Sequence, residues 1–117
     1  MNPVLNPGSF VFTTVDNTNS IPPEEIIGTF REKEGITIII SQEAADQLGL
    51  SYHFITSWIT LEVHSSLEAV GLTAAFSNAL AKANISCNVM AGYYHDHIFV
   101  GKADEERAMM VLQKKIL

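Results

Sequence analysis

The chain of 117 residues contains one cysteine, Cys87, and no long apolar run. A single thiol cannot form an intrachain disulfide, so the sequence fits a cytoplasmic protein better than a secreted one. No stretch approaches the roughly 18 consecutive apolar residues of a membrane-spanning helix. No positively charged segment precedes an apolar stretch near the N-terminus, so we also expect no signal peptide.

Basic residues are scarce as well. Seven Lys and Arg stand against thirteen Asp and Glu, which gives a formal net charge of −6. Nucleic acids and anionic membranes bind through basic patches, so we expect neither as a partner. The apolar share of 47% is enough for a sizeable core, and the length suits one compact domain.

Hydrophobic periodicity and turn residues predict alternating strands and helices. The segment 55–64 is the clearest strand, with Ile59, Leu61 and Val63 on one face and Trp58, Thr60, Glu62 and His64 on the other. The other expected elements are a strand at 9–15, a loop at 16–25, two strands within 26–41 joined near Glu34-Gly35, a helix at 42–49 capped by Ser41, a helix at 67–83, a hairpin at 86–101 turning near His95-Asp96, and a helix at 104–116 with Ala108, Val111, Leu112 and Ile116 inward.

A hairpin followed by a helix occurs twice, at 27–48 and at 88–116, with an offset of about sixty residues. The second half reads strand, helix, strand, strand, helix, the order of a split βαβ unit. We therefore predict an α+β, ferredoxin-like fold built from two β-α-β-β-α halves packed side by side. Residues 1–54 would form a first, incomplete half and residues 55–117 the second, together making one compact domain.

The joint between the strong strand and the long helix, "VHSSLEAVG", gathers several polar groups. Ser65 and Glu68 have the S-x-x-E spacing of a capping box, which explains both by helix capping alone. The free amides of a helix N-terminus, here at 66–69, also attract an anion such as a carboxylate. Gly71 would let a ligand approach the backbone closely. A zwitterion could place its carboxylate on the amides and its ammonium on Glu68 or Asp96.

Three further patterns could carry chemistry. His95, Asp96 and His97, with His64 nearby, could ligate a metal, but a polar hairpin turn at a ligand pocket or subunit edge is the more ordinary explanation. A Ser–His–Asp set could be written from Ser65 or Ser66, but the G-x-S-x-G elbow is absent. We therefore expect no enzyme, no catalytic residues, no metal and no cofactor. We expect Cys87 to be a buried residue that packs like a small apolar side chain.

Two other features concern recognition. Arg31, in the charged hairpin "FREKEG", could clamp a carboxylate, or it could form a solvated cross-strand pair. The long helix is rich in alanine and nearly apolar all round, as is typical of a helix buried on two sides. The second side would be another helix of the chain or a second subunit, so we expect a twofold homodimer or higher homo-oligomer.

The stretches "FREKEGITIII" and "ITLEVHSSLEAVGLTAAFSNALAKANISCNVMAGYYHDHIFV" resemble a family of small bacterial, stand-alone ACT-domain proteins. The resemblance covers nearly the whole chain. It implies two tandem ACT-like halves, similar to the regulatory modules of aspartate kinases. It also implies small-molecule sensing, with an amino acid as the expected ligand, at the joint between a first strand and its helix.

Carried onto this sequence, the resemblance implies a ligand site at the joint and on the strand that faces it. The expected residues are His64, Ser65, Ser66, Leu67, Glu68, Ala69, Val70 and Gly71, with Asn88 and Val89 on the facing strand and Tyr94, His95, Asp96 and His97 as further members on the hairpin. The alternatives are a self-associating interaction module with no ligand, or a small metal-dependent enzyme that uses the histidines and Asp96.

Overall fold

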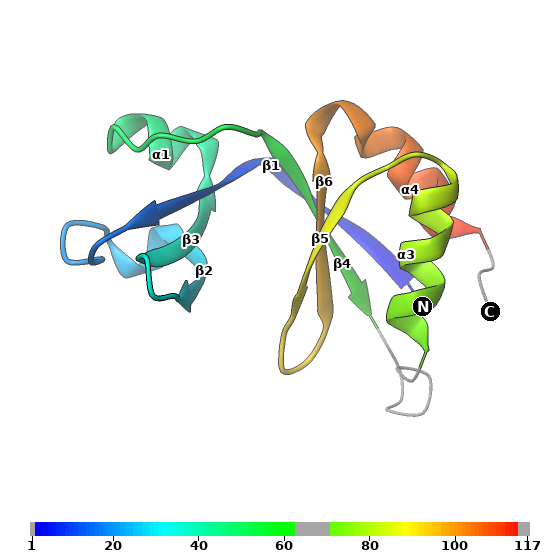
Figure 1. Ribbon diagram of the computed structural model, residues 1–117. Helices are drawn as coiled ribbons and strands as arrows, with labels where there is room; N and C mark the ends of the chain where they lie inside the picture. Colours follow the sequence, from blue (N-terminus) through cyan, green and yellow to red (C-terminus); the bar gives the residue numbers. More distant parts are fainter. Residues whose placement is uncertain (1, 63–70, 115–117) are drawn as a thin grey trace. The chain divides into compact units, whose positions relative to one another are not determined.

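The structure is a computed structural model that describes residues 2–62 and 71–114. Contacts divide the chain into two compact units, one of Gly8–Thr56 and one of Met1–Pro7 with Ser57–Leu117. Strand β1 (Asn2–Val15) contributes residues to both units, and Figure 1 shows it as the long blue strand. We call Gly8–Thr56 the first unit and the remainder the second unit.

The first unit contains three strands in the order β2-β3-β1. Strands β2 (Ile26–Arg31) and β3 (Ile36–Ser41) form an antiparallel hairpin, and β3 pairs antiparallel with β1. The hairpin turns where the sequence predicts, with the Glu32 amide donating to the Gly35 carbonyl at 2.9 Å. The expected loop before β2 contains one short 3-10 helix, η1 (Pro23–Glu25).

Helix α1 (Gln42–Gln47) follows β3, and Ser41 caps it as predicted. The Ser41 hydroxyl accepts from the Ala44 amide at 3.1 Å, which satisfies one of the free donors of the first turn. Ala44 and Ala45 are buried on the sheet, and small side chains there let the short helix lie close. The core of the first unit consists of Val11, Ile21, Ile38, Ile40, Ala44 and Ala45.

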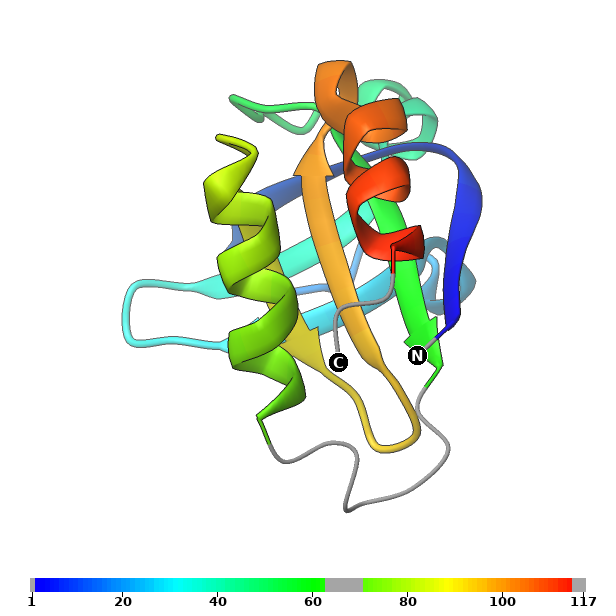
Figure 2. The ribbon, with the colours of Figure 1, turned by 90° about the vertical axis from the view of Figure 1, so that its right-hand side faces the viewer.

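Within its described residues, the second unit contains four strands in the order β1-β4-β6-β5. Strand β4 spans Thr56–Glu62, and β5 (Cys87–Ala91) and β6 (Asp96–Gly101) form an antiparallel hairpin. Helix α3 (Leu72–Lys82) and helix α4 (Glu105–Gln113), the latter preceded by η2 (Lys102–Asp104), lie on the same face of these strands (Figure 2). This arrangement confirms the α+β, ferredoxin-like fold.

The core of the second unit lies between its strands and its two helices. Ile59 and Leu61 of β4 point into it, as their alternation predicts, and Ala108 and Leu112 are the inward residues of α4. Its other buried members are Leu72, Phe76, Leu80, Ile85, Ile98 and Val100. Trp58 and Thr60 lie on the opposite face of β4, where they are half-buried. The predicted inward positions Val63 and Ile116 lie outside the described residues.

Strand β1 is longer than the sequence indicates. It begins at Asn2 rather than Ser9, although Pro3 and Pro7 cannot donate to a sheet ladder. The Asn6 side chain compensates, because its amide nitrogen donates to the Trp58 carbonyl at 3.2 Å and to the Thr60 hydroxyl at 2.9 Å. These bonds place the start of β1 beside β4 within the second unit.

The long helix also differs from the prediction. A helix running unbroken from Leu67 to Ala83 is wrong, because Gly71 has a left-handed backbone with φ of 81° and serves as the N-cap of α3. The described helix therefore begins at Leu72 and ends at Lys82. The sequence keeps an apolar, helix-like periodicity through Gly71, but the backbone of Gly71 is not helical.

Candidate ligand site

Most of the predicted ligand site falls on a part of the chain that the structure does not describe. His64, Ser65, Ser66, Leu67, Glu68, Ala69 and Val70 lie in the stretch 63–70, outside the described residues. Their assignment to the site, and the capping box of Ser65 and Glu68, stay predictions. The described edges of the joint are Glu62 at the end of β4 and Gly71 before α3.

Gly71 is the described residue of the joint that bears most directly on ligand binding. It is exposed, no side chain caps α3 at this point, and a Cβ built on Gly71 would meet no described atom within 4 Å. The first helical bond runs from the Ala75 amide to the Gly71 carbonyl at 3.0 Å. The amides of Leu72, Thr73 and Ala74 therefore have no partner inside the helix, and such amides favour an anion.

Asn88 and Val89 do not present their side chains to the same side of β5. Val89 packs against the core of the second unit, whereas its neighbour Asn88 is exposed and stands opposite Phe99 in the register of β6. Successive residues of a strand point to opposite faces. A single ligand can thus meet one of these side chains and only the backbone of the other.

The hairpin between β5 and β6 turns earlier than predicted. Its tip is Gly92–His95, closed by the Gly92 amide donating to the His95 carbonyl at 2.9 Å, and Asp96 is already the first residue of β6. Tyr93 and Tyr94 form the exposed end, with their ring centroids 4.9 Å apart in an edge-to-face arrangement. Polar spacing around His95-Asp96 suggested the turn there, but Gly92 allows the tight closure because a Cβ would lie 2.9 Å from the His95 carbonyl oxygen.

His97 lies at the centre of a hydrogen-bonded network on the sheet face opposite the helices. Its Nδ1 accepts from the Trp58 indole nitrogen at 3.0 Å and lies 3.1 Å from the Thr60 hydroxyl. Thr60 in turn accepts from Asn6 at 2.9 Å, and the Trp58 ring stacks on Phe99 with 6.1 Å between centroids. Strand alternation placed Trp58 and Thr60 on one face, but no local pattern pointed to Asn6, because it lies between two prolines.

The donors of this network determine the protonation state of His97. Because the indole N–H can only donate, Nδ1 of His97 must be an acceptor, so the neutral ring carries its proton on Nε2. Burial lowers the pKa of His97, the neighbouring His95 lowers it further, and Asp96 acts weakly in the opposite direction. The bond from Trp58 and the lowered pKa both favour the neutral form of His97.

The metal alternative receives no support from the described side chains. Within residues 2–62 and 71–114, no three His, Cys, Asp or Glu side chains come together as a set that could hold an ion. Nδ1 of His97 already accepts a hydrogen bond from Trp58. The rings of His95 and His97 are edge-to-face, with centroids 6.4 Å apart. His64, the other proposed ligand, lies outside the described part.

Cys87 shows no sign of an activated thiol. It is half-buried against the core of the second unit, and burial raises the pKa of its thiol. A raised pKa leaves less of the nucleophilic thiolate at neutral pH. This agrees with the prediction of a small apolar packing residue.

Arg31 borders a hollow of about 560 Å³ in the first unit, together with Thr18, Thr29 and Ile36. Its neighbour Glu32 is tied to the Thr37 hydroxyl. No hydrogen bond or ion pair joins the Arg31 guanidinium to another of the described side chains. The guanidinium can only donate hydrogen bonds, and the two threonine hydroxyls can donate as well. Such a set of donors suits a carboxylate, which accepts hydrogen bonds. The interpretation of Arg31 as a carboxylate clamp is therefore retained as a prediction.

With the fold and these residues in place, comparison with known proteins defines the class. One ACT-domain family model matches residues 1–57 and a second matches residues 54–114. The chain therefore belongs to the ACT-domain family and carries two ACT domains in tandem. ACT domains are regulatory modules, so the chain is a regulatory module.

Solved structures agree with this class. A Vibrio cholerae protein of unknown function, described as a "possible transport protein", shares 50% identity, covers 94% of this chain and 85% of its own, and has a TM-score of 0.85. An Agrobacterium tumefaciens protein at 16% identity covers 90% of this chain and 81% of its own, with a TM-score of 0.71. A Porphyromonas gingivalis domain, provisionally described as the C-terminal regulatory domain of aspartate kinase, covers 99% and 96% at 14% identity, with a TM-score of 0.55.

The two distant structures support the fold alone, because their identity to this chain is low. No protein with a curated description matches the chain by sequence. Among the described helices, none has the length and apolar character to cross a bilayer.

Proposed function

We propose that this tandem ACT protein senses a small zwitterion, an amino acid, at the joint between β4 and α3. The observation that carries the proposal is the pair of ACT-domain matches that together cover residues 1–114. The proposed ligand residues are those of the sequence prediction, 64–71 with Asn88, Val89, His95 and Asp96. His97 leaves this set, because its acceptor nitrogen is already bonded to Trp58.

The described edge of the joint supports the proposal. The amides of Leu72, Thr73 and Ala74 extend the predicted donor set of 66–69 beyond Gly71, where the backbone is open to solvent. A ligand carboxylate held there would be favoured by the partial positive charge of the helix start. Glu68 and Asp96 are the acidic groups proposed for the ammonium.

A thermal-shift screen of the twenty amino acids tests the proposal. A ligand at about 100 times its dissociation constant stabilises the folded state by roughly 2.7 kcal/mol, which is readily seen as a rise in Tm. We expect one amino acid, or a small related group, to produce such a rise. A screen in which no amino acid shifts Tm at millimolar concentration would instead favour the self-associating interaction module.

Replacement of Glu68 separates ligand binding from helix capping. If Glu68 holds the ligand ammonium, Glu68→Ala weakens the affinity measured by calorimetry at least tenfold while lowering stability by no more than about 1 kcal/mol. Glu43→Ala, which changes an exposed carboxylate on α1 in the first unit, is the matched control. Unchanged affinity in Glu68→Ala would leave only the capping role.

A further inference from the structure

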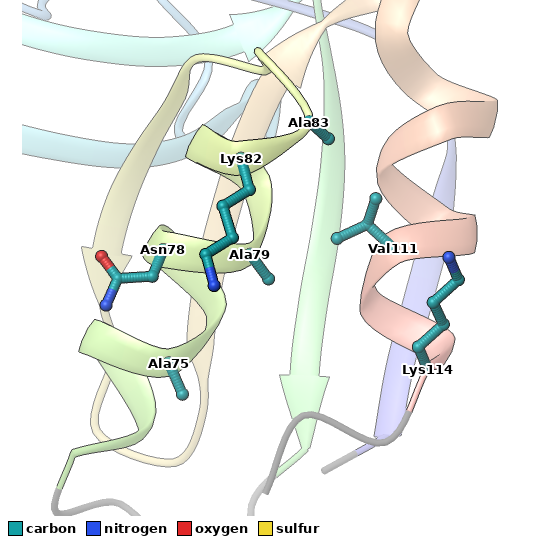
Figure 3. Close-up of a pocket in the computed structure, with 7 residues that line it drawn as sticks. All are labelled: Ala75, Asn78, Ala79, Lys82, Ala83, Val111 and Lys114. Atoms are coloured by element: carbon teal, nitrogen blue, oxygen red, sulfur yellow. The ribbon is translucent and has the colours of Figure 1, made fainter.

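Helices α3 and α4 leave an open groove between them on the outer side of the second unit (Figure 3). Its volume is about 510 Å³. The half-buried side chains of Ala75, Ala79, Ala83 and Val111 line it, and Val111 points from α4 toward α3. Alanines on α3 leave the groove shallow, so another apolar side chain can approach both helices closely.

An exposed methionine, Met110, is the sequence neighbour of the groove residue Val111. Met110 is 63% exposed, and it precedes Val111 on α4. The buried residues Ala108 and Leu112 lie two positions to either side of it, about 200° around the helix axis, so Met110 points away from the core. Methionine is flexible and polarisable, which suits it to filling a shallow apolar depression on a partner.

Opposite charges flank Met110 symmetrically. Glu106 lies four residues before it and Lys114, the C-cap of α4, four residues after it. Each is about 6 Å from Met110 along the helix axis. Among the described residues neither side chain has a hydrogen-bonding or ion-pair partner, whereas Asp104 and Glu105 of the same segment pair with Arg107 and Lys102.

We propose that this face is where a second copy of the chain docks, with the two α4 helices antiparallel about a twofold axis at Met110. Each Met110 packs over Val111 and the alanine-lined groove of the other copy. The antiparallel arrangement places Glu106 of each copy opposite Lys114 of the other, which gives two equivalent ion pairs. Each copy thus presents a projecting side chain, Met110, and the groove that receives it, with Glu106 and Lys114 as the two charges. This surface is complementary to itself, as a twofold interface requires.

Charge complementarity is what favours a second copy over another partner. A chain with net charge −6 repels an identical chain except where opposite charges are arranged to meet. Exposed ion pairs contribute little energy, so the pairs determine register and the apolar contacts of Met110 hold the copies together. Lys82, on the α3 side of the groove, has no counterpart in this arrangement.

Sedimentation velocity and light scattering on the full chain test the interface. We expect a dimer at micromolar concentration, and Met110→Glu should raise the dimer dissociation constant about tenfold or more. Because Met110 is exposed, the variant should keep the wild-type Tm at a concentration where both are monomeric. A wild-type chain that stays monomeric at 100 times that concentration, or a dimer that Met110→Glu leaves intact, would overturn the proposal.

A charge exchange distinguishes self-pairing from any other occupant. Glu106→Lys and Lys114→Glu should each weaken the dimer, and the double variant should restore it, because the two changes re-create the pairs in reverse. Lys82→Glu is the matched control and should weaken the dimer less than Lys114→Glu. Failure of the double variant to restore the dimer would contradict the arrangement. The amino-acid screen described above is unaffected by Met110→Glu, so the two proposals succeed or fail separately.

Discussion

At the scale of the residue, His97 shows how neighbours determine a chemical state. Trp58 can only donate, so the ring opposite it must accept, and acceptance requires the neutral form. Desolvation acts in the same direction and lowers the pKa of His97. Protonation would turn an accepting nitrogen into a donor that faces another donor.

The pH dependence of stability follows from this lowered pKa. A group whose pKa is lower in the folded state than in the unfolded state destabilises the fold as pH falls below its unfolded value, which is 6.5 for an ordinary histidine. We expect the wild-type Tm to fall between pH 7.5 and pH 5. His97→Gln cannot titrate, so its Tm should fall less over the same range, and thermal unfolding followed by circular dichroism measures both.

The control for this experiment is His53→Gln, which changes an exposed histidine of the first unit. Trp58 is the only tryptophan of the chain, so its fluorescence reports the network directly. Identical pH profiles for wild type and His97→Gln, by Tm and by fluorescence, would show that His97 does not titrate in this way.

Gly71 makes a second prediction at the residue scale. Its φ of 81° lies in the left-handed region, while no atom of the described residues lies within 4 Å of the position where a Cβ would sit. Gly71→Ala should therefore cost about 1–2 kcal/mol of unfolding free energy through backbone strain alone. Asn tolerates this conformation better, so Gly71→Asn should cost measurably less in the same chemical denaturation series. Equal costs would point to a contact rather than to backbone strain.

At the scale of the element, a buried hydroxyl on β4 hydrogen-bonds to the first turn of α4. Ser57, which is fully buried, donates to the Glu105 carboxylate at 2.6 Å, and this bond, followed by that from Lys102, lowers the pKa of Glu105. The bond fixes the first turn of α4 at the end of the strand. It is a contact within the second unit between two segments that are distant in sequence.

Removing the hydroxyl tests that attachment. Ser57→Ala should destabilise the protein by about 1–2 kcal/mol, because a buried hydrogen bond to a charged group is lost. Glu105 contributes stability above its unfolded pKa that is lost as the pH falls through its lower folded value. The difference in unfolding free energy between wild type and Ser57→Ala should therefore shrink below pH 4. A difference that does not change with pH would assign the effect to packing.

Local signals in the sequence predicted many elements of this fold but missed others. Ser41 could be read as a helix cap because its hydroxyl acts on Ala44, three residues away. The first turn of α3 was misplaced because "LEAVGLTAAF" has helical periodicity on both sides of Gly71. The start of β1 was missed because its pairing depends on Asn6 bonding to Trp58 and Thr60, more than fifty positions along the chain.

The candidate site was harder to predict than the fold. The sequence could indicate which residues cluster at the β4–α3 joint, because they are neighbours along the chain. It could not show that Asn88 and Val89 point to opposite faces or that His97 is engaged by Trp58. Those facts depend on strand register and on partners distant in sequence.

At the scale of the whole molecule, the chain has a separate hydrophobic core in each of its two units. Phe76 is fully buried in the core of the second unit. Phe76→Ala should cost about 3–5 kcal/mol of unfolding free energy, measured by chemical denaturation. Tyr93→Ala, at the exposed hairpin tip, should change stability by no more than about 0.5 kcal/mol. A similar cost for both variants would contradict this core assignment.

Two ACT domains in one chain place this molecule among regulatory modules, and the proposed amino-acid ligand gives such a module something to sense. The most direct test is a crystal structure of the chain grown with the amino acid that raises Tm most in the screen. The account predicts electron density for a zwitterion beside Gly71, with its carboxylate within hydrogen-bonding distance of backbone amides at the start of the helix. A ligand bound away from residues 64–74, or a joint filled by the protein's own side chains, would contradict it.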